Sequence, residues 1–141
     1  MTDQEFNELK AEADKGDVES MIECAKMLQD GIDCKKNPKK AVQYAKKALD
    51  QGSDEGMRLY GLYLCSGKGI AKDVNEGIRY IKLAIDQGND EAMNNYAQML
   101  LIGDGVTANR EEAIRLFKMA IEKGNDEAMF EYAMILREGD S

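Results

Sequence analysis

The chain has 141 residues, of which 43% are hydrophobic and 33% are charged, a balance typical of a folded domain with a core. Its 19 basic and 27 acidic residues leave a net charge of −8, which repels phosphate backbones and anionic lipid, so we expect no nucleic-acid or membrane partner. The chain has no histidine, and its three cysteines lack the spacing of a disulfide framework or a zinc site, which argues against a metal, a cofactor and an enzyme.

The first predicted element is a single helix within residues 1–16, which we interpret as the second half of an incomplete repeat. Phe6, Leu9 and Ala13 form its apolar side, and Gly16 follows it. Several residue classes then recur every 36 residues, which indicates tandem repeats. They are the glycines Gly16, Gly52, Gly88 and Gly124, the methionines Met21, Met57, Met93 and Met129, and the leucines Leu28, Leu64, Leu100 and Leu136.

Three full repeats follow, at residues 17–52, 53–88 and 89–124, and each is predicted to contain two helices. The first helix has an apolar face at i, i+3, i+4 and i+7, as in Met57, Tyr60, Gly61 and Leu64. Polar residues that cap helix N-termini precede these helices, at Asp17, Ser53, Asn89 and Asn125. The second helices begin after Asn37, Asp73 and Asn109, and Gly52, Gly88 and Gly124 follow them.

Residues 125–141 are predicted to form a first helix with no second helix after it. The chain is therefore expected to be all-α, an α/α solenoid with about eight helices wound as a right-handed superhelix. We expect residues 1–141 to form a single repeat domain with a half repeat at each end. The recurring methionines are expected to fill the core, and Cys24, which occupies the register of a core tyrosine, is expected to be buried and inert.

The repeats resemble the Sel-one-like repeat family, which is related to the tetratricopeptide repeats. The family's loop pattern G-x-G-V-x-x-D matches residues 67–73 and 103–109, and its small first-helix residue matches Ala25, Gly61, Ala97 and Ala133. In the first repeat Asp33 and Cys34 replace the second glycine and the valine, so we expect a less regular loop there. The resemblance implies an adaptor or scaffold in multi-protein assemblies, and it implies no active site.

Two other patterns are better explained by structure than by chemistry. Gly67, Lys68 and Gly69 lack the spacing and the preceding strand of a phosphate-binding loop, so they are interpreted as a tight turn. The acids that recur at helix starts are interpreted as capping residues rather than catalytic carboxylates. The N-terminus has neither a basic segment nor an apolar segment of a signal peptide, which favours a cytoplasmic location.

The candidate protein-binding site is the concave face, which first helices line in solenoids of helical pairs. A peptide or a helix is the expected ligand, and Asn94 and Gln98 would hold the backbone of an extended peptide. The apolar members of this face would form a groove, or the curvature would bury them between neighbouring first helices; the sequence leaves both open. The predicted contact residues are Ile22, Lys26, Arg58, Leu62, Asn94, Gln98, Leu101, Ile102, Phe130 and Met134.

The last helix suggests an alternative function, because nothing in the sequence pattern covers Phe130 and Met134. A second copy of the chain would bury them in a homodimer, which makes a self-assembling structural protein the alternative to the adaptor. One stability effect is also expected from local propensity. Gly77 stands where Ala41 and Ala113 stand in the other second helices, so Gly77→Ala is predicted to stabilise the fold.

Overall fold

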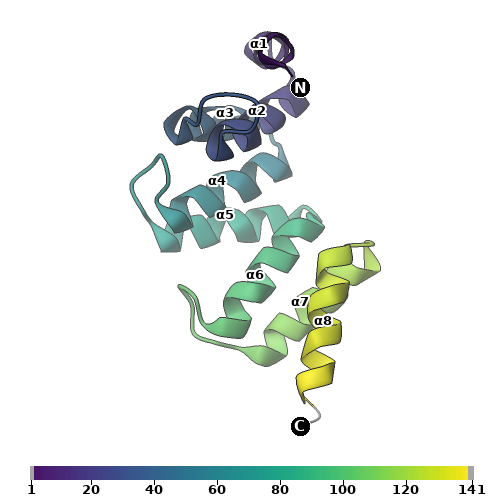
Figure 1. Cartoon of the computed structure of the whole chain (residues 1–141). Coiled ribbons are helices and arrows are strands. Elements are labelled where there is room, and N and C mark those ends of the chain that lie inside the picture. The colour runs from purple at the N-terminus through teal and green to yellow at the C-terminus, as the bar shows by residue number, and fades with distance from the viewer. Residues whose placement is uncertain (1, 140–141) are drawn as a thin grey trace. The chain divides into compact units, whose positions relative to one another are not determined.

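The computed structural model describes residues 2–139, and every regular element among them is an α-helix (Figure 1). The all-α repeat fold predicted from the sequence is confirmed. The helices are α1 (Asp3–Asp14), α2 (Val18–Asp30), α3 (Pro38–Asp50), α4 (Asp54–Ser66), α5 (Val74–Asp86), α6 (Asp90–Ile102), α7 (Arg110–Glu122) and α8 (Asp126–Gly139). They fall into two compact units, which divide after Leu83 near the end of α5, and each unit is described separately.

Polar side chains begin the helices as the sequence predicts. In all eight described helices a side-chain oxygen accepts a hydrogen bond from the backbone N–H three residues later, at donor–acceptor distances of 2.8 to 3.2 Å. Each such bond satisfies a backbone donor that the helix itself leaves unpaired, which stabilises the fold by about 1 kcal/mol. The capping residues are Thr2, which was not predicted from the sequence, and Asp17, Asn37, Ser53, Asp73, Asn89, Asn109 and Asn125.

The loop of the first repeat is more like the others than its sequence suggests. Asp33 has a φ of 58°, in the same left-handed region as Gly69 and Gly105 at 80° and 75°. Aspartate enters this region more readily than most residues that have a side chain, so the loop keeps the backbone turn without the glycine. The expectation of a less regular loop is therefore wrong for this backbone position.

The first unit has its core between α2, α3 and α4, with α1 packed at its edge. Cys24, Ala25 and Ala45 are fully buried there, and the predicted burial of Cys24 is confirmed. The Tyr44 hydroxyl donates a 2.9 Å hydrogen bond to Asp14, which fastens the end of α1 to α3. Burial of the phenol and this carboxylate both raise the pKa of Tyr44 above its ordinary value.

The second unit has its core between α6, α7 and α8. Met93 and Ala97 of α6 pack with Leu116 and Phe117 of α7, and Ile135 anchors α8 to the same cluster. Two polar contacts join α6 to α8: Asn125 Nδ2 donates to Asp90 at 2.9 Å, and Asn94 Nδ2 donates to Glu127 at 3.2 Å. The first helices of this unit are therefore neighbours at their N-terminal ends.

Helices α4 and α5 meet through two glycines. A Cβ atom placed on Gly61 would lie 2.6 Å from the carbonyl oxygen of Gly77, and one on Gly77 would lie 2.5 Å from Cys65 Sγ. Such distances are well inside van der Waals contact, and one of the obstructing atoms belongs to the backbone. The predicted stabilisation by Gly77→Ala is therefore wrong, because helix propensity is local and this close approach is not.

The recurring methionines do not all fill the core. Met21 and Met93 are almost completely buried, as expected. Met129 is 49% exposed, because no helix among the described residues lies over its side of α8. The same register position therefore has a different environment at the end of the repeats.

Candidate protein-interaction site

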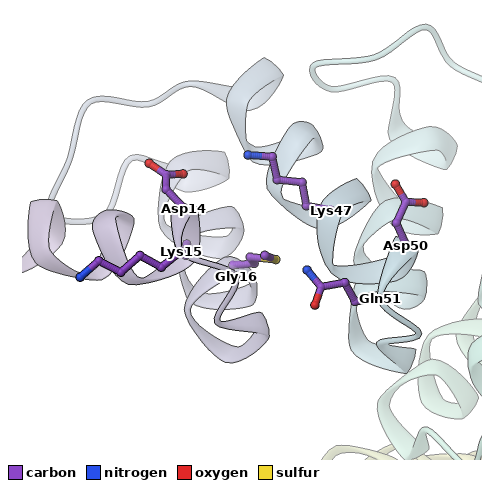
Figure 2. Close-up of a pocket in the computed structure, with 8 residues that line it drawn as sticks. Asp14, Lys15, Gly16, Lys47, Asp50 and Gln51 are labelled. Atoms are coloured by element: carbon purple, nitrogen blue, oxygen red, sulfur yellow. The ribbon is translucent and has the colours of Figure 1, made fainter.

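Within residues 2–139, no group of three or more histidine, cysteine, aspartate or glutamate side chains is placed to hold a metal ion. A pocket of about 370 Å³ lies where the turn after α1 approaches the end of α3 (Figure 2). Asp14 and Lys15 line it on one side, and Lys47 and Asp50 line it on the other. Asp14 accepts the hydrogen bond from Tyr44, so this pocket has a structural explanation as the attachment of α1.

In the first unit, the predicted contact residues differ in accessibility. Ile22 and Arg58 are buried, whereas Lys26 and Leu62 are half-buried. Glu55 brings the two cations together, since its carboxylate lies 2.7 Å from Arg58 and 3.5 Å from Lys26 on the neighbouring first helix. The guanidinium of Arg58 therefore helps to hold α4 and leaves little of its surface for a ligand.

The same unit contains an acidic groove that our sequence reasoning missed. Its volume is about 440 Å³, and it lies between the N-terminal ends of α2 and α4 above Ile22. The acids at these helix starts were interpreted separately as caps, and only the packing of α2 beside α4 brings them to one groove. They are Glu19, Glu23, Asp54 and Glu55.

In the second unit, the predicted polar residue Asn94 is only 1% exposed. Its Nδ2 donates to Glu127, while its Oδ1 is buried without a hydrogen-bond partner in the described structure. A buried acceptor without a donor costs about 1–3 kcal/mol, which makes Asn94 an unusual residue to retain. Gln98, which lies one turn further along α6, is half-buried.

The apolar residues of the predicted face in the second unit differ in how much of each side chain is exposed. Leu101 is half-buried, but Ile102 is 74% exposed, Phe130 is 65% exposed and Met134 is 37% exposed. These three side chains come from α6 and α8, the two first helices that Asn94 and Glu127 connect. Burial between neighbouring helices, one of the two interpretations left open by the sequence, therefore applies to Ile22 and not to Ile102 or Phe130, and the groove stays a prediction.

Cys24 and Cys34 show no sign of nucleophilic activation. Burial raises the pKa of the Cys24 thiol to about 11, and burial together with nearby carboxylates raises the pKa of Cys34. A reactive cysteine needs a lowered pKa and an accessible sulfur atom. No disulfide joins any of the three cysteines, and Cys24 is fully buried.

The fold resembles several solved structures. A Sel1 repeat protein from Oxalobacter formigenes is 25% identical with a TM-score of 0.78, and the match covers 98% of this chain and 62% of the other. A protective antigen with an SLR fold from uropathogenic Escherichia coli is 23% identical over 93% of this chain and 28% of its own, with a TM-score of 0.75. Helicobacter pylori cysteine rich protein B is 22% identical over 92% of this chain and 96% of its own, with a TM-score of 0.70.

The chain thus spans less than two thirds of the length of the first two of these proteins. Comparison with curated proteins gives no match. No helix among the described residues is long and apolar enough to cross a bilayer.

The model of the Sel1 repeat matches residues 18–53, 54–89 and 90–125, each within one residue of a repeat predicted from the sequence. Because these matches cover well over half of the chain, the protein belongs to the Sel1 repeat family.

Proposed function

We propose that the protein is an adaptor or scaffold that binds a peptide or a helix of another protein on the first-helix face of its second unit. Proteins with Sel1 repeats commonly mediate protein–protein interactions. The observation that carries the proposal is the exposure of Ile102, Phe130 and Met134 on α6 and α8. Large apolar side chains that are exposed among polar ones are typical of interaction surfaces.

Polar residues beside this apolar group would orient the ligand. Gln98 offers an amide that both donates and accepts, which suits the backbone of an extended segment. Asn94 is buried beneath the face, where the hydrogen bond that its Nδ2 donates to Glu127 would hold α8 beside α6 for the ligand. The acidic groove of the first unit would attract basic residues of the same partner or of another one.

The experiment that tests this function is a selection of random 12-residue peptides on the immobilised chain, followed by titration of the enriched sequences. Ile102→Glu combined with Phe130→Glu is expected to abolish their binding, because the two carboxylates would be desolvated at the centre of the interface. Ile32→Glu is the matched control, since Ile32 is an exposed isoleucine in a loop of the first unit. Equal binding by all three proteins would refute this site.

A homodimer is the second candidate function, and the exposure of Phe130 and Met134 on one side of α8 favours it. A second copy that covers this side would remove both side chains from water. Light scattering during gel filtration over a hundredfold concentration range measures it. A mass that doubles from 15.7 kDa, and that stays constant in Phe130→Glu/Met134→Glu, is expected for a dimer. A constant mass in the parent protein would eliminate it.

We propose a cytoplasmic location and no catalytic role. Three cysteines without a disulfide are consistent with a reducing compartment. The charge of −8 likewise supports a protein or peptide partner in preference to nucleic acid or a membrane surface. Fractionation of the native host would test the location, and a measurement of binding to anionic vesicles would test the preference for a protein partner over a membrane surface.

A further inference from the structure

A second apolar surface lies on α8, on the side that faces α7. It forms a groove of about 540 Å³ between these two helices, and its lining is mostly apolar. Met129 is 49% exposed and Leu136 is 53% exposed, although both belong to the repeating apolar pattern of first helices. We call this surface the α7–α8 groove. Its lining residues are Lys118, Ile121, Glu122, Met129, Tyr132, Ala133 and Leu136.

The chain contains a filled copy of this groove two repeats earlier, between α3 and α4. There α5 occupies the position that is open beside α8. The rings of Tyr60 and Tyr80 meet edge to face with their centroids 5.1 Å apart. Gly61, which corresponds to Ala133, lies directly against the backbone of Gly77 and the side chain of Ile81. As a result Leu64, which corresponds to Leu136, is only 5% exposed.

The pair α6 and α7 gives a second filled example within the unit that carries the groove. Ala97 of α6 is fully buried in a cluster with Ala113, Leu116 and Phe117 of α7. The same positions of α3 are Ala41, Tyr44, Ala45 and Ala48, and all four are buried against α2. The helices that cover first helices in this chain therefore share the pattern small-x-x-(Tyr/Leu)-apolar-x-x-Ala.

We propose that the α7–α8 groove binds an amphipathic helix of another polypeptide that carries this pattern and takes the position of a second helix. The small residue of the ligand would lie against Ala133, and its Tyr or Leu would pack on Tyr132. The following apolar residue would enter between Met129 and Leu136. This site lies on a different side of α8 from Phe130 and Met134, so it goes beyond the proposed function and does not depend on it.

Two observations favour such a helix as the occupant. Ile121 and Tyr132 already pack against the core of the second unit, so a helix in the groove would extend an existing interface. The edge of the groove also carries Lys118 and Glu122, one helical turn apart. Lys118 lies over the ring of Tyr132 at 5.7 Å from its centroid. A ligand with one acid and one base on its flank would match these two charges.

The chain's own α1 does not have this chemistry. It occupies the register of a second helix, but Glu5, Glu8 and Glu12 stand where α3 has Ala41, Tyr44 and Ala48. All three glutamates are exposed. Burying them in an apolar groove would cost far more than the contacts return, so head-to-tail association of α1 with α8 is not the expected use of the groove.

The probe is a fluorescently labelled peptide with the sequence of residues 109–124, which contains the pattern as Ala113, Leu116, Phe117 and Ala120. Its anisotropy is measured while the full chain is added. We expect saturable binding that Leu136→Glu weakens by at least about tenfold, because a carboxylate would be buried against the ligand. A control peptide with Phe117→Glu is expected not to bind.

The control protein is Ile32→Glu, which places the same charge at an exposed isoleucine of the first unit and should leave peptide affinity unchanged. Leu136 is exposed, so Leu136→Glu should keep the helical circular dichroism of the parent chain. The proposal is overturned if the parent chain does not bind the peptide saturably, or if Leu136→Glu binds it equally well. It is also overturned if the parent chain is a dimer that Leu136→Glu converts to a monomer, because a second copy would then fill the groove.

Discussion

The helix pairs α4–α5 and α6–α7 have the same register but meet through different residues. Glycines face each other in the first pair, at Gly61 and Gly77, where neither backbone has room for a methyl group. Alanines occupy the corresponding positions of the second pair, at Ala97 and Ala113, and both are fully buried. The repeat therefore determines where two helices meet, while the residue at the contact determines how closely their backbones approach.

This difference is expected to give the largest effect on stability. Gly77→Ala should lower the free energy of unfolding by about 1–3 kcal/mol, because the added methyl group meets Cys65 and the backbone of Gly61. Alanine's better helix propensity returns only about 0.5–1 kcal/mol of this loss. Urea denaturation followed by circular dichroism measures the net change.

A second measurement identifies the cause of the loss. If the new methyl group displaces α5 from α4, then Cys65 should react faster with iodoacetamide in Gly77→Ala than in the parent chain. Cys24 serves as the internal control, since it is fully buried away from this contact. An increase in stability would show that α4 and α5 leave room for a methyl group between Gly77 and Gly61.

The reverse substitution tests the alanine pair. Ala97→Gly removes a buried methyl group and places glycine inside a helix, so we expect a loss of about 1–2 kcal/mol. Opposite substitutions at equivalent positions would then both destabilise the protein. The same urea titration measures the change, and an unaltered midpoint would mean that α6 and α7 close up around glycine as α4 and α5 do.

A pH titration extends the comparison to Cys24, which has the register of Tyr60 in α4 and Tyr96 in α6. Its thiol has a folded pKa of about 11 against an ordinary 9.0, so the folded state holds this proton more tightly than the unfolded state. The contribution of this thiol to the free energy of unfolding is fully present below pH 9 and is lost as the pH rises toward 11. At pH 10 the expected loss is about 1 kcal/mol.

Cys24→Ala is the variant that isolates this contribution. It should melt at a lower temperature than the parent chain at neutral pH, and the difference between the two proteins should shrink between pH 9 and pH 11. Tyr63, whose pKa burial also raises, remains in both proteins, and its contribution cancels in the difference. A constant difference across this range would show that the thiol does not ionise there.

The smallest effect on stability is expected from an ion pair that occurs once within α5 and once, at the equivalent position, within α7. Arg79 holds the pKa of Glu76 below its ordinary value in α5, and Arg115 does the same for Glu112 in α7. A lowered pKa means that each contribution is present above about pH 4–5 and is lost as the pH falls further. Glu76→Gln and Glu112→Gln should therefore shift the neutral-pH melting temperature slightly and equally, and 1 M salt should abolish the shift.

The sequence predicted those features that depend on near neighbours along the chain. Ser53 and Asn89 mark helix starts because a capping side chain acts on the backbone three residues later. The burial of Arg58 and Asn94 could not be obtained this way, because it depends on how adjacent first helices pack. The prediction for Gly77→Ala was wrong for the same reason. Helix propensity depends only on α5 itself, whereas the atoms that obstruct the new methyl group belong to α4.

The incomplete coverage of α8 has a consequence for its amide hydrogens. Helix α7 is packed between α6 and α8, whereas α8 is anchored mainly through Ala128 and Ile135. Local opening of α8 breaks few apolar contacts, so its backbone N–H groups should exchange with deuterium sooner than those of α7. A helix bound in the groove would place α8 between two other helices. Its binding should therefore slow amide exchange along α8 without any change of secondary structure.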